Sequence, residues 1–77
     1  MIRSLSHVAD ICRENGIDGR TPAFAVLAND AQWGRWPSPN HVQPIIDSLR
    51  ANAAFWATRN AERSQLLEAA ALALATH

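Results

Sequence analysis

The sequence predicts a small all-α domain of three or four helices. Apolar residues recur at helical spacing, alanine is abundant and disfavours strands, and glycine and proline separate the periodic segments. The 77 residues are enough for one domain, so we expect a single helical domain over residues 1–77.

The hydrophobic fraction overstates the core that such a domain can build. Hydrophobic residues make up 48% of the chain, but 15 of them are alanine, and Leu, Ile, Val and Phe together number 17. A domain of this size rarely draws more than about 3–5 kcal/mol from its core. Large multidomain enzymes, membrane bundles and disulfide scaffolds are therefore excluded.

The first helix is predicted over residues 5–15. Ser4 and Ser6 are both suitable N-cap residues. Gly16 suits the left-handed position after the helix, and Ile17 can supply the apolar contact that follows it. The predicted buried stripe consists of Leu5, Val8, Ala9, Ile11 and Cys12.

The second helix is predicted to start at Thr21-Pro22, with threonine as the cap and proline at the first helical position. It should end between Asn29 and Trp33, with Gly34 as the terminator. A strand over residues 23–28 is the alternative, although no partner strand is visible. The apolar stripe of the helix consists of Phe24, Leu27, Ala28 and Ala31.

Residues 34–39 form a proline-rich linker, and a long helical pattern extends from His41 to Thr76. Ser38 or Asn40 can cap its start. A straight helix of that length would span about 54 Å, whereas a compact domain of this size has a radius of gyration of about 11–12 Å. We therefore predict a break near residues 58–61, with Thr58 or Asn60 as a second cap. The alternative is a continuous helix whose end docks on a partner. The predicted apolar face consists of Ile46, Leu49, Ala53, Trp56, Leu67, Ala70 and Leu74.

The charge balance offers no attraction to nucleic acid or to an anionic membrane. Seven basic residues, all arginine, balance seven acidic residues. Frequent Ala and Arg together are typical of GC-rich bacterial genomes and their mobile elements. The one cysteine allows no internal disulfide, and neither a signal peptide nor a membrane span is visible. We expect a cytoplasmic protein.

Groups that could carry catalysis or hold a cofactor or metal are sparse. His7 and Cys12 are five residues apart, so on a helix they do not face each other. The triplet Asp47-Ser48-Leu49 resembles the phosphopantetheine attachment site of acyl carrier proteins, in which Ser48 would be the modified residue. Carrier proteins are acidic and place the triplet at a helix start, whereas here it lies inside a predicted helix of a neutral chain. We predict no enzymatic activity, no cofactor and no metal.

The most suggestive segment for partner binding is Trp33-Gly34-Arg35-Trp36. Tryptophan and arginine dominate interface hot spots, and a turn stiffened by proline lowers the entropic cost of binding. The alternative is that the rings fold back on the core, with Trp36 packing on Val42. The last apolar run, residues 66–74, needs cover from other helices or from a second chain. The predicted partner-binding residues are Trp33, Arg35, Trp36, Arg59 and Arg63.

The sequence therefore predicts a non-enzymatic protein-binding module that acts as an inhibitor or adaptor. A narrower hypothesis is a phage or mobile-element protein that blocks a host complex, such as a defence complex. One alternative is a small DNA-binding transcriptional regulator, although the predicted second helix offers only Asn29 to read a base edge. Another is a structural homodimer formed through the C-terminal helix. The DNA-binding alternative requires clustering of Arg3, Arg13 and Arg20, or of Arg35, Arg59 and Arg63.

Overall fold

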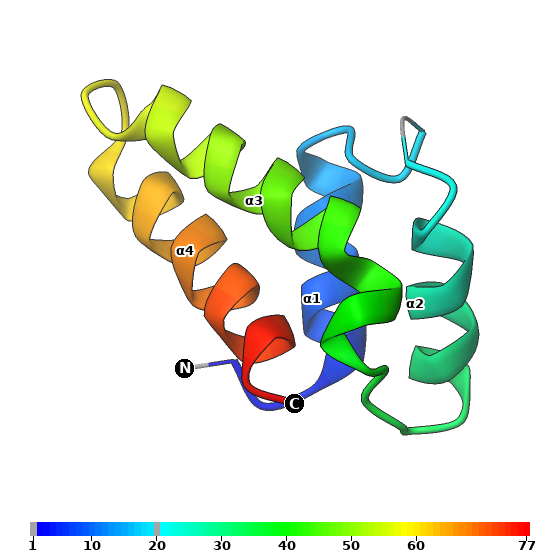
Figure 1. The fold of residues 1–77 in the computed structure, drawn as a ribbon. Coiled ribbons are helices and arrows are strands. Elements are labelled where there is room, and N and C mark those ends of the chain that lie inside the picture. The colour runs from blue at the N-terminus through cyan, green and yellow to red at the C-terminus, as the bar shows by residue number, and fades with distance from the viewer. Residues whose placement is uncertain (1, 20) are drawn as a thin grey trace.

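A computed structural model describes residues 2–19 and 21–77, which contain helices and no strand. Figure 1 shows α3 and α4 side by side as an antiparallel hairpin, with α1 behind α3 and α2 on the opposite side of α1 from α4. The all-α fold class is confirmed, and the strand alternative over residues 23–28 is wrong. The elements are α1 (Leu5–Glu14), α2 (Phe24–Gln32), the 3₁₀ helix η1 (Pro39–Val42), α3 (Gln43–Trp56) and α4 (Ala61–Ala75).

Helix α1 has the boundaries and caps that its sequence predicts, to within one residue. The Ser4 side chain accepts a hydrogen bond from the His7 backbone N–H at 3.2 Å. Gly16 has a φ of +72°, and the Ile17 N–H donates to the Cys12 carbonyl at 2.9 Å. These bonds form a Schellman motif, and the burial of Ile17 supplies its apolar contact.

Helix α2 starts two residues later than predicted. The Thr21 side chain makes no capping bond; instead its carbonyl accepts from the Phe24 N–H at 2.9 Å, and the Pro22 carbonyl accepts from Ala25 at 3.1 Å. These bonds span three residues, so the chain enters α2 through a tight 3₁₀-like turn that needs no side-chain cap. The end of α2 at Gln32 agrees with the prediction.

The linker leads into α3 through η1. The sequence predicts a long helix that starts near His41, but η1 occupies that position and α3 begins at Gln43. Neither Ser38 nor Asn40 provides a side-chain cap; the Ser38 carbonyl accepts from the His41 N–H at 2.9 Å. Pro44 lies in the first turn of α3, where its missing N–H leaves no bond unmade.

The predicted break in the long helix is confirmed. Helix α3 ends at Trp56 and α4 begins at Ala61. Asn60 is the second cap: its side chain accepts from the Arg63 N–H at 3.1 Å. The hairpin gives the molecule dimensions of 35 × 25 × 19 Å and a radius of gyration of 11.2 Å, within the range expected for a compact chain.

The core fills the space between α1, α3 and α4. The predicted stripe of α1 is fully buried, whereas α2 contributes only Leu27. On the long helical face every predicted residue is buried except Trp56, which packs against the core while partly exposed. Within the described residues no helix is long and apolar enough to cross a membrane. The buried residues of the hairpin are Ile45, Ile46, Leu49, Ala53, Leu67, Ala70, Ala71 and Leu74.

Candidate functional site

The turn that follows α2 holds an exposed tryptophan in a defined position. Gly34 has a φ of +68°, and the Arg35 N–H donates to the Asp30 carbonyl at 2.9 Å, which forms a second Schellman motif. Trp33 is the C-cap residue, and its side chain is 66% exposed. The Arg35 guanidinium lies 3.7 Å from the Asp30 carboxylate and is itself well exposed.

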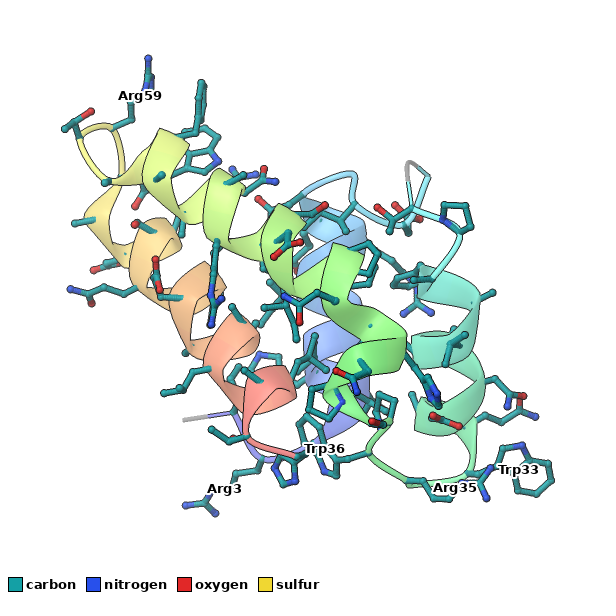
Figure 2. The ribbon with its side chains drawn as sticks, in the orientation of Figure 1. Arg3, Trp33, Arg35, Trp36 and Arg59 are labelled. Atoms are coloured by element: carbon teal, nitrogen blue, oxygen red, sulfur yellow. The ribbon has the colours of Figure 1, made fainter. Side chains whose placement is uncertain are left out.

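The second half of the turn is anchored to the body of the protein. The Trp36 ring stacks on the His77 ring, with 4.1 Å between centroids and 12° between planes. Pro37, the next residue, is buried. The two tryptophans therefore differ: Trp36 packs inward, as one alternative predicts, and Trp33 projects into solvent (Figure 2).

Arg59 lies at the tip of the α3–α4 hairpin, in contact with an exposed aromatic ring. Its guanidinium lies 4.1 Å from the centre of the Phe55 ring and donates to the Phe55 carbonyl at 2.7 Å. Phe55 is 52% exposed and makes an edge contact with Trp56, with 5.1 Å between ring centroids. Phe55 lies outside the buried stripe of α3, so helical periodicity gives no signal for it.

Arg63 is occupied by contacts within the chain. Its Nε and Nη2 atoms donate to Asn15 Oδ1 at 3.0 and 2.7 Å, and its guanidinium lies 4.1 Å from the centre of the Trp56 ring. These contacts join the end of α1 to both helices of the hairpin. The geometry gives Arg63 a structural role in the fold, and its predicted contact with a partner stays a prediction.

The five predicted partner-binding residues do not form one site. Figure 2 shows Trp33 and Arg35 at one corner of the molecule and Arg59 at the opposite corner, with Trp36 apart from both. Arg59 and Arg63 are four residues apart, a spacing that predicts one shared face on a continuous helix, but Arg59 lies in the turn between α3 and α4. Helical spacing also carries no information about which end of the hairpin meets the turn after α2. The turn and the hairpin tip are therefore separate surfaces.

The arginines are dispersed over the molecule. Figure 2 places Arg3, Arg35 and Arg59 at three different corners, and Arg13 pairs with Asp10 at 3.1 Å. Arg20 lies outside the described residues. Since phosphate binding requires several cations on one face, this distribution does not favour the DNA-binding alternative, which stays a prediction.

The two side chains that could carry covalent chemistry, Cys12 and Ser48, are buried and half-buried, respectively. Burial, reinforced by the nearby Asp18 carboxylate, raises the pKa of the Cys12 thiol from 9.0 to about 12, so the thiol stays protonated at neutral pH. Ser48, the residue that resembles a carrier-protein attachment site, lies half-buried within α3. Among residues 2–19 and 21–77, no three His, Cys, Asp or Glu side chains come together as a metal site would require.

Three further exposed apolar side chains are prominent: Val26 on α2 and Leu66 and Leu72 on α4. The apolar run over residues 66–74 is covered within the chain at Leu67, Ala70, Ala71 and Leu74 but not at Leu66 and Leu72, and the expected cover by a second chain stays a prediction. Comparison with known proteins identified no matching family model, no similar curated protein and no similar solved structure.

Proposed function

We propose that this chain is a non-enzymatic protein-binding module whose contact surface is the turn formed by Trp33, Gly34 and Arg35. The observation that supports the proposal is the 66% exposure of Trp33 on a turn whose backbone is held on both sides. A monomeric domain with so small a core would stabilise itself by burying this ring. Its exposure is typical of an interface anchor.

Contacts within the chain hold the backbone on both sides of the turn. On one side the Schellman bonds fix Gly34 and Arg35 to α2; on the other the stacked Trp36 and the buried Pro37 hold the chain to the core. Little backbone entropy is then lost on binding, so more of the contact energy appears as affinity.

The chemistry of the turn indicates what the partner presents. The Trp33 ring requires an apolar pocket. The Arg35 guanidinium is 69% exposed and makes one long contact to Asp30, so most of its donors remain free for a carboxylate or carbonyl groups at the rim of that pocket. Inhibition of a host complex by a phage or mobile-element protein is the narrower form of this proposal, and composition alone supports it.

The test is affinity capture from a bacterial lysate with four baits: the wild type and the Trp33→Ala, Arg35→Ala and Phe55→Ala proteins. Trp33→Ala removes the anchor, and Phe55→Ala removes the exposed ring at the opposite end of the molecule as a matched control. We expect a stoichiometric partner to bind the wild type and the Phe55→Ala protein. We expect its affinity for Trp33→Ala to fall by about thirtyfold or more, and for Arg35→Ala by about fivefold.

Two results would contradict the proposal. One is the recovery of no stoichiometric partner by any bait. The other is a partner whose affinity changes equally in the Trp33→Ala and Phe55→Ala proteins, since contact would then lie elsewhere. Circular dichroism of each variant verifies that the helices are intact.

A further inference from the structure

The outer face of α4 carries an exposed leucine beside a surface hollow. Leu72 is 61% exposed, the most exposed aliphatic side chain among the large apolar residues that reach solvent. It lines an open hollow of about 260 Å³. The other lining residues are Ile2, Ala69, Ala73, Thr76 and His77.

Two opposite charges flank this surface at its two ends. Glu68 lies on α4 one turn before Leu72, and Arg3 follows Ile2 at the end of the hollow nearest the helix C-terminus. Figure 2 shows Arg3 near the C-terminal end of α4. Both charged side chains are exposed, and neither forms an ion pair within residues 2–19 and 21–77.

We propose that a second copy of this chain occupies the hollow, with the two α4 helices antiparallel around a two-fold axis beside Leu72. Each Leu72 then enters the hollow of the other copy, which gives the self-complementarity that a two-fold interface requires. The same arrangement brings Glu68 of each copy toward Arg3 of the other, so that two complementary charge pairs flank the leucines.

The charge pattern selects this occupant and this direction. A parallel arrangement would place Glu68 against Glu68 and Arg3 against Arg3, which costs energy at both ends. The formal net charge of zero leaves no long-range repulsion between copies. Figure 2 places Trp33 at a different corner from Arg3, so the dimer leaves both Trp33 turns exposed, and this proposal does not rest on the proposed function.

The first test is sedimentation equilibrium of the full chain from about 1 μM to about 1 mM. We expect the mass to rise from the 8.4 kDa of one chain toward twice that value. Leu72→Glu should raise the dissociation constant roughly a hundredfold or more, because it places a charge in an apolar contact that occurs twice. Leu66→Glu, the same change on another side of α4, should leave it within about twofold.

The second test is a charge swap. Arg3→Glu and Glu68→Arg should each raise the dissociation constant about tenfold, and the double variant should return it to within about threefold of the wild type. A wild type that stays monomeric at about 1 mM would overturn the proposal and leave the Trp33 surface untouched. If Leu72→Glu and Leu66→Glu weakened the dimer equally, the proposed contact surface around Leu72 would be wrong. If the charge swap did not restore affinity, the proposed antiparallel arrangement would be wrong.

Discussion

Replacement of Arg63 by alanine tests whether one polar side chain joins α1 to the α3–α4 hairpin. The change removes two donors to Asn15 Oδ1, at 3.0 and 2.7 Å, and the contact 4.1 Å above the Trp56 ring. A hydrogen bond from a charged donor contributes about 1.5–3 kcal/mol, and a partly exposed cation–π contact adds about 0.5–1 kcal/mol. Both donors share one acceptor, so we expect a total loss of about 2–3 kcal/mol.

That loss is large beside the stability of a domain of this size. With a core worth about 3–5 kcal/mol, the variant should be close to unfolding at room temperature. Its melting temperature, followed by circular dichroism, should fall by about 10–20 °C. Arg63→Lys should lose about half as much, because lysine keeps the charge but cannot fork onto Asn15 or stack on Trp56. Arg50, exposed on α3, is the matched control, and Arg50→Ala should change stability by less than about 0.5 kcal/mol.

A double-mutant cycle with Asn15→Ala isolates the contact between the two residues. Asn15 also donates to the Ile11 carbonyl at 2.8 Å, so its single replacement includes the loss of that bond. The coupling energy between Asn15 and Arg63 should be about 1–2 kcal/mol. A coupling energy below about 0.5 kcal/mol, or an Arg63→Ala protein as stable as the Arg50→Ala control, would show that Arg63 does not join α1 to the hairpin.

Three further predictions use the same denaturation assay. Gly16→Ala should lower the free energy of unfolding by about 1 kcal/mol, because Gly16 has a φ of +72° although nothing crowds an added Cβ. Gly19→Ala should be nearly neutral, and equal losses in the two variants would contradict the role given to the positive φ. Asn60→Ala should cost about 1 kcal/mol through loss of the α4 cap, whereas Thr58→Ala should cost much less. Burial raises the pKa of the Cys12 thiol to about 12 in the folded state. The contribution of this thiol to the free energy of unfolding should therefore be complete below about pH 9 and be lost as the pH rises to 12. The chain has no Lys or Tyr to titrate in that range, and a Cys12→Ala protein that keeps the same pH slope would refute the assignment.

Local signals located the helix ends where a backbone bond or a cap fixes them. Gly16 and Gly34 mark their helix ends because each adopts a positive φ that other residues rarely accept. Asn60 marks the start of α4 because a side-chain oxygen there can accept an orphan N–H. The same reasoning failed at Thr21, because a backbone carbonyl formed the first turn in place of the side chain.

Whether each tryptophan of the turn is buried or exposed depends on residues far away in the sequence. Trp36 packs on His77, and no local pattern connects two residues 41 positions apart. Likewise the Arg63 guanidinium donates to Asn15, 48 residues away, so this predicted partner-binding residue is occupied by a contact within the chain. Periodicity shows which residues share a face, but it does not show which other segment that face meets.

The sequence by itself determined the all-α class, the buried stripes of α1 and of the α3–α4 hairpin, and the break in the long helix, because these follow from side-chain period, capping and the shortage of core. It did not determine the stripe of α2, of which only Leu27 is buried. Only the tertiary structure decided that Trp33 stays exposed while Trp36 is covered, and that Leu72 remains outside. The physical reason is geometric. Helices α3 and α1 pack against α4 and leave Leu72 on its outer side, and the distant His77 ring covers Trp36 but not Trp33.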